Sequence, residues 1–103
     1  SHYERALNIF QKALSPNHPN LGSSYNNIAV LYESVGEYEK ALSHYETALV
    51  IRQKALPPNH PDLGSSYNNI AVLYKSMGEY EKALSHYETA LNIFQKALPP
   101  NHP

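Results

Sequence analysis

The sequence has no cysteine and no tryptophan, and its charges nearly cancel, with 8 lysine and arginine residues against 9 aspartate and glutamate residues. Without cysteine the chain can form no disulfide bond and has no thiol chemistry, which fits a cytoplasmic protein. The formal net charge of −1 gives no electrostatic basis for binding nucleic acid or an anionic membrane. No apolar run approaches the roughly 18–20 residues of a transmembrane helix, and the polar start of the chain predicts no signal peptide.

The most informative feature present is a tandem repeat with a period of 42 residues. Residues 1–42 and 43–84 differ at seven positions, so 35 of the 42 are identical, and residues 43–61 differ from 85–103 at two. The seven pairs are Arg5/Thr47, Asn8/Val50, Phe10/Arg52, Ser15/Pro57, Asn20/Asp62, Glu33/Lys75 and Val35/Met77. A fixed period of this length is typical of arrays in which each unit packs on its neighbours.

Proline and glycine divide each unit into two helices. Helix breaks are predicted at the proline-rich runs Ser15–Pro19 and Pro57–Pro61, and at Gly36 and Gly78, where a tight turn is expected. The first helices are expected at 19–35 and 61–77 and the second helices at 37–56 and 79–98, with another second helix at 1–14. Pro61 suits the first turn of its helix, and His60 or Asn59 is the expected N-cap.

The apolar spacing near 3.6 residues favours helices over strands. In the last two helices the apolar positions are Leu63, Tyr67, Ile70, Ala71, Leu73, Tyr74, Tyr80, Ala83, Leu84, Tyr87, Ala90, Leu91 and Leu98. The alanines would let helix axes approach closely, and the tyrosines would fill the space between them. The predicted fold is therefore all-α: an α-solenoid of antiparallel helix pairs with five helices. We expect a single domain, made of a half repeat at 1–18 and repeats at 19–60 and 61–103.

These residues carry a resemblance to a known family. The run Tyr67, Ile70, Ala71, Tyr74, Gly78, Tyr80, Ala83, Tyr87 and Ala90 resembles the tetratricopeptide signature, and its copy 42 residues earlier matches equally. The long unit also looks like that of kinesin light chains, through the segment Ala48–Leu56 followed by His60-Pro61-Asp62. Phe10 and Phe94 depart from the arginine that this pattern favours. The resemblance implies a superhelix with a peptide-binding groove.

The groove is expected along the first helix of each unit, because these helices line the inner face of such arrays. The side chains left over after the core is assigned are Ser23, Asn26, Val30, Glu33, Ser65, Asn68, Val72 and Lys75. Asparagine is a poor helix former, so its presence within these helices suggests a reason, and its amide can both donate to and accept from a peptide backbone. For the adjacent Asn27 and Asn69, a hydrogen bond between helices is the expected role.

Two interpretations of function follow. The first is a scaffold that binds an extended peptide or a segment of a protein partner in the groove. The alternative is a structural module that assembles with itself, as a homodimer, a domain-swapped oligomer or an end-to-end stack, with Phe10 and Phe94 at the contacts. We expect no enzyme, no cofactor and no nucleic-acid or membrane partner. The six histidines recur only because the unit recurs, so capping and surface positions are favoured for them over metal binding.

Overall fold

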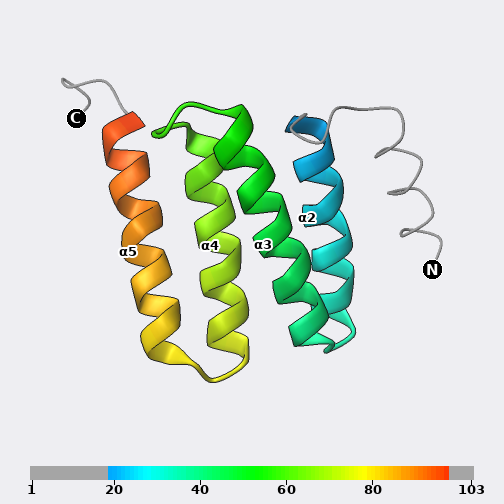
Figure 1. The fold of residues 1–103 in the computed structure, drawn as a ribbon. Coiled ribbons are helices and arrows are strands. Elements are labelled where there is room, and N and C mark those ends of the chain that lie inside the picture. Colours follow the sequence, from blue (N-terminus) through cyan, green and yellow to red (C-terminus); the bar gives the residue numbers. More distant parts are fainter. Residues whose placement is uncertain (1–18, 98–103) are drawn as a thin grey trace. The chain divides into compact units, whose positions relative to one another are not determined.

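Four α-helices make up the part of the chain that the computed structural model describes, residues 19–97 (Figure 1). They are α2 (Pro19–Ser34), α3 (Tyr38–Ala55), α4 (Pro61–Ser76) and α5 (Tyr80–Ala97). Each of these helices begins and ends within one residue of its predicted bounds, so the all-α class and the breaks at Gly36, Pro57–Pro61 and Gly78 are confirmed. The break predicted at Ser15–Pro19 falls mainly outside the described residues. The fifth predicted helix, at 1–14, lies outside the described residues. No helix within residues 19–97 is both long and apolar enough to cross a membrane.

The helices pair as two antiparallel hairpins, α2 with α3 and α4 with α5 (Figure 1). The chain divides between Ala55 and Leu56 into two compact units. We call the hairpin of α2 and α3 unit 1 and the hairpin of α4 and α5 unit 2. In each unit a helix of 16 residues and one of 18 residues are joined by a short turn, and a short connection makes antiparallel packing of the two helices the natural arrangement.

Glycine forms the turn within each hairpin. Gly36 and Gly78 have φ angles of 84° and 80°, which an L side chain rarely adopts. In unit 1 the amide of Gly36 donates to the carbonyl of Glu33 at 3.0 Å, and the amide of Glu37 donates to the carbonyl of Tyr32 at 2.9 Å. This pair of bonds is the Schellman arrangement that satisfies carbonyls at a helix end. Unit 2 repeats it, with donor–acceptor distances of 3.0 and 2.9 Å.

The helix cap before α4 is formed as the sequence predicts. The His60 side chain accepts a hydrogen bond from the backbone amide of Asp62, with 3.0 Å between Nδ1 and N. His60 has extended backbone angles, and Pro61 occupies the first helical position, where a missing amide hydrogen costs nothing. The cap therefore satisfies an amide that the helix itself leaves without a partner.

The core of each unit contains small side chains where the helices meet. In unit 1, Ala29, Ala41 and Ala48 have no exposed surface. The equivalent residues in unit 2 are Ala71, Ala83 and Ala90, each at most 4% exposed. Alanine at these places allows close approach of the helix axes, as the repeat signature predicts.

Three apolar side chains of α5 that were expected in the core are exposed instead. Tyr80, Leu84 and Leu91 have exposed fractions of 68%, 60% and 57%. They lie on a different face of α5 from the buried Ala83 and Ala90. Within unit 2, α5 packs against α4 alone, so one face of it is covered. The prediction was wrong for these three because helical spacing identifies apolar positions but does not show how many faces a helix buries.

Candidate functional site

The predicted groove positions recur on the first helix of each unit. We call Ser23, Asn26, Val30 and Glu33 the α2 stripe, and Ser65, Asn68, Val72 and Lys75 the α4 stripe. Spacings of three, four and three residues place each set on one helix face. All four residues of the α4 stripe are exposed, whereas in the α2 stripe Asn26 is buried and Glu33 is half-buried. The two stripes therefore differ in the surface they offer.

In unit 1, Asn26 is hydrogen-bonded to the second helix. The amide orientation that satisfies both side chains has the Asn26 oxygen accepting from Nη1 and Nη2 of Arg52, at 2.9 and 3.0 Å. Asn26 is only 8% exposed, and Arg52 passes close to Gly22, where a built Cβ would lie 3.2 Å from Cγ of Arg52. The bond joins α2 to α3 and occupies the carbonyl oxygen of Asn26.

Glu33 is also bonded within unit 1. The hydroxyl of Tyr45 donates to Oε1 of Glu33 at 2.8 Å, in a partly buried position. Burial raises the pKa of Tyr45 well above its ordinary value, and the bond to the Glu33 carboxylate raises it further. Tyr45 is 3% exposed, so this hydroxyl has little access to water and the carboxylate is its partner. Two of the four α2 stripe residues thus hold α2 against α3.

Unit 2 lacks both of these bonds because two residues are exchanged. Phe94 stands at the position of Arg52 and has no group that can donate, so Asn68 has no counterpart to the Arg52 bond. The Phe94 ring packs on α4 instead, with Cε1 and Cζ 2.9 Å from a Cβ built on Gly64. Lys75 replaces Glu33 and cannot accept from Tyr87. Within residues 19–97, the side chains of Asn68 and Lys75 form no hydrogen bond or ion pair.

A hydrogen bond between the two helices is expected of Asn27 and Asn69, but in unit 1 Asn26 forms it instead. Asn27 is exposed and Asn69 is half-buried, whereas Asn26 makes the bond to Arg52. The Arg52/Phe94 exchange is the sequence signal for the bond of Asn26, because a guanidinium needs an acceptor and a phenyl ring does not.

Each unit also has a cluster of aromatic rings that the sequence did not indicate. His44 lies between Tyr25 and Tyr32, with ring centroids 5.9 and 5.2 Å apart. Nδ1 of His44 is 2.8 Å from the carbonyl of Lys40, one turn earlier, and Nζ of Lys40 lies 5.6 Å from the Tyr32 ring centre. Unit 2 repeats the arrangement, using Tyr67, Tyr74, Lys82 and His86. Such contacts stabilise the hairpin and give these histidines a structural role.

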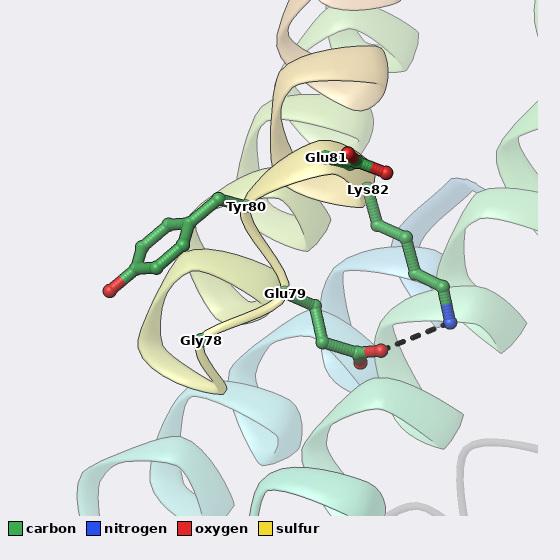
Figure 2. A pocket seen from close by; sticks show the side chains of 5 residues that line it. All are labelled: Gly78, Glu79, Tyr80, Glu81 and Lys82. Carbon is green, nitrogen blue, oxygen red and sulfur yellow. Dashed lines mark ion pairs between the residues drawn. The ribbon is translucent and has the colours of Figure 1, made fainter.

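A small hollow lies at the turn between α4 and α5. Figure 2 shows its lining residues, which are Gly78, Glu79, Tyr80, Glu81 and Lys82. Nζ of Lys82 is 3.2 Å from Oε1 of Glu79, and this hydrogen bond and the Glu79 charge raise the pKa of Lys82. The Tyr80 side chain points away from the pair (Figure 2). An exposed ion pair one turn apart is ordinary helix chemistry, so the hollow offers no convergent polar groups.

Two further expectations concern metal ions and the phenylalanines. In the described part of the chain, no group of three or more histidine, aspartate or glutamate side chains is placed to hold a metal ion. Phe94 is half-buried against Gly64 within its own unit. Phe10 lies outside the described residues. Self-association through these two residues therefore stays a prediction.

The paired helices, the glycine turns and the proline-bounded units define a helical-repeat protein. A family model for the tetratricopeptide repeat matches residues 1–54 and 23–96. The chain belongs to this family, as the signature residues predict. Among curated proteins, none matches the chain.

Solved structures agree on the repeat type. The crystal structure of BtubC (BKLC) from P. vanneervenii is 32% identical, with a TM-score of 0.84. A crystal structure of a single-residue variant of a putative kinesin light chain from Podosopora anserina, with nearly identical TPR-like repeats, is 28% identical, with a TM-score of 0.82. Another structure of that putative light chain has 28% identity and a TM-score of 0.76. Each match covers 98% of this chain. The matched part is 40% of the first protein's length and 48% of the length of the other two. The resemblance to kinesin light chain repeats is thereby confirmed.

Proposed function

We propose that the chain is a protein–protein interaction module that binds an extended segment of a partner protein along the first helices of its units. The observation that supports this proposal is the α4 stripe, in which polar side chains flank Val72 and all four residues are exposed. An asparagine amide within such a row can donate to and accept from a peptide backbone. Proteins of this repeat family generally bind other proteins and are generally not enzymes.

Selection from a random-peptide library displayed on phage tests this proposal. Enriched peptides are synthesised, and their affinity for the immobilised chain is measured beside the variant Asn68→Val, whose asparagine is exposed. We expect enrichment, and we expect the variant to keep its helicity and to bind about 0.5–1.5 kcal/mol more weakly, as the loss of one backbone-directed hydrogen bond would cause. Absence of any enriched peptide would count against a peptide-binding role. Unfolding of the variant would show that Asn68 is structural.

A second candidate function, self-assembly, is favoured by the exposed apolar face of α5. Tyr80, Leu84 and Leu91 are spaced by four and seven residues and are each more than half exposed. A helix face of this kind is often covered by another protein surface. Sedimentation of the chain over a range of concentrations separates this function from peptide binding, because an assembly module would be oligomeric without any ligand.

A further inference from the structure

One face of α5 is exposed although the same face of α3 is not. On α5 it carries Tyr80, Leu84 and Leu91, with exposed fractions of 68%, 60% and 57%. Their copies on α3 are all half-buried: Tyr38, Leu42 and Leu49. We call Tyr80, Leu84 and Leu91 the α5 face. Nearly identical sequences thus show that this apolar face can be withdrawn from solvent, and in unit 2 it is free to be covered.

The first helices show the opposite difference between the units. Leu31 of α2 is 38% exposed, whereas its copy on α4, Leu73, has an exposed fraction of 0%. Ser24 is half-buried, and its copy Ser66 is 1% exposed. Asn27 is exposed, and its copy is half-buried. Spacings of three and four residues place Ser24, Asn27 and Leu31 on one side of α2, which we call the α2 face.

Resting on the self-assembly function above, we propose that copies of the chain associate head to tail, with the α5 face of one copy packed on the α2 face of the next. The sequence itself points to this occupant. Residues 1–14, which precede α2, and residues 85–98, most of which belong to α5, differ only at Arg5/Thr89. A first helix is therefore preceded in the chain by nearly the sequence of α5, so a second copy brings side chains suited to α2.

The chemistry of the two faces is complementary. The α5 face consists of large apolar side chains, whereas the α2 face has Leu31 beside the smaller Ser24 and Asn27, so a ridge meets a shallow surface. The hydroxyl of Ser24 donates to the carbonyl of Asn20 at 3.1 Å. Because this bond lies within α2, an apolar surface can cover the serine without leaving its hydroxyl unpaired. Covering the apolar side chains of both faces supplies the driving force.

Such an interface does not close on itself. Each copy has one α5 face and one α2 face, so the contact joins two different surfaces, and a dimer still has one free face of each kind. Association therefore continues beyond the dimer as the concentration rises. A contact between two α5 faces would behave differently, because it uses the same surface on both copies and stops at the dimer.

Sedimentation of variants altered on one face at a time tests this arrangement. Leu91→Lys disrupts the α5 face and Leu31→Lys the α2 face, and circular dichroism first establishes that both are helical. We expect wild type to associate between tens and hundreds of micromolar and each variant alone to stay monomeric. Val50→Lys is the matched control, because Val50 is an exposed apolar residue of α3 outside both faces, and it should associate as wild type does. If Leu31→Lys fails to fold, Asn27→Glu replaces it, since Asn27 is exposed on the same face.

A mixture of the two variants gives the decisive result. The intact α5 face of Leu31→Lys can pack on the intact α2 face of Leu91→Lys, and the altered faces prevent any further growth. We expect a one-to-one complex from two components that are each monomeric. If wild type associates but Leu31→Lys still dimerises and mixing changes nothing, this inference is overturned while self-assembly stands. If wild type remains monomeric at hundreds of micromolar, the inference and the self-assembly function both fail, and peptide binding is unaffected.

Discussion

The hydroxyl of Tyr45 donates to the carboxylate of Glu33 at 2.8 Å and thereby joins the second helix of unit 1 to its first helix. The copy of this tyrosine, Tyr87, lacks the equivalent carboxylate, because Lys75 replaces Glu33. This exchange therefore removes the tyrosine–carboxylate bond from unit 2. The comparison of the two units provides a control for most of the experiments below.

Tyr45→Phe should lower the free energy of unfolding by about 1.5–2 kcal/mol, the lower part of the range for hydrogen bonds to a charged group. The matched substitution Tyr87→Phe should change it by less than about 0.5 kcal/mol, because no carboxylate accepts from that hydroxyl. Thermal or urea denaturation of both variants measures the difference. Equal losses would show that the Tyr45–Glu33 bond contributes no stability.

The same bond predicts how stability depends on alkaline pH. Burial and the Glu33 bond raise the pKa of Tyr45 in the folded chain, whereas in the unfolded chain it titrates near its ordinary value of about 10. The unfolded state therefore loses this proton first as the pH rises, and the stability that depends on it is present below about pH 10 and is lost above it. Denaturation between pH 8 and pH 11 should show a steeper fall for wild type than for Tyr45→Phe.

Gly64→Ala should destabilise the chain by about 1–2 kcal/mol, although alanine usually stabilises a helix relative to glycine. The new Cβ would lie 2.9 Å from two ring atoms of Phe94, and a packed ring has little room to move. At the equivalent Gly22 the nearest atom is Cγ of Arg52 at 3.2 Å, which a flexible side chain can accommodate, so Gly22→Ala should be neutral or stabilising.

Combining Gly64→Ala with Phe94→Arg should remove most of the loss, since the arginine would stand where unit 1 has Arg52, whose flexible side chain can accommodate a Cβ. The melting temperatures of wild type, Gly22→Ala, Gly64→Ala and the double variant provide the measurement. A Gly64→Ala variant as stable as Gly22→Ala would show that Phe94 does not pack on this glycine.

Enlarging the buried alanines should also destabilise the fold. Ala71→Leu and Ala83→Leu should each lower the free energy of unfolding by about 1–3 kcal/mol, because close helix approach leaves no room for added methylene groups. Ala71 has no exposed surface and Ala83 has 4%. Ala97, exposed at the end of α5, supplies the control, and Ala97→Leu should leave the melting temperature unchanged. Unchanged melting of all three variants would refute the tight-packing assignment.

Association at high concentration remains an expectation of the sequence. Sedimentation of wild type beside a variant with Phe10→Arg and Phe94→Arg tests it, and we expect wild type to form dimers or stacks that the variant does not form. Phe94 is half-buried within unit 2, so part of any effect would come from changed packing on Gly64. Tyr80→Lys with Leu84→Lys, on the exposed face of α5, is the comparison variant. A wild-type monomer at hundreds of micromolar would contradict this prediction.

The helices were predictable because their boundaries depend on local chemistry. Pro61 cannot continue a preceding helix, Gly36 and Gly78 adopt positive φ angles, and His60 has an acceptor nitrogen within reach of the first turn. Such effects involve neighbours in sequence, so a single sequence contains them. The repeat supplies each signal more than once, which is why the bounds agree within one residue.

The availability of the stripe side chains was not predictable in the same way. Helical spacing placed Asn26 and Asn68 on equivalent faces, but it could not show that Arg52, 26 residues after Asn26, would bond to one of them. The exposure of Tyr80 and Leu91 was missed for a related reason, because apolar character does not show which faces a helix buries. That the chain forms one domain with repeats at 19–60 and 61–103 stays a prediction.

A partner segment is proposed to lie along the α4 stripe. Amide and side-chain chemical shifts, measured by NMR during titration with a peptide enriched in the selection, test this most directly. We predict that the largest shift changes fall on Ser65, Asn68, Val72 and Lys75. Changes confined to the exposed face of α5, at Tyr80, Leu84 and Leu91, would contradict the account.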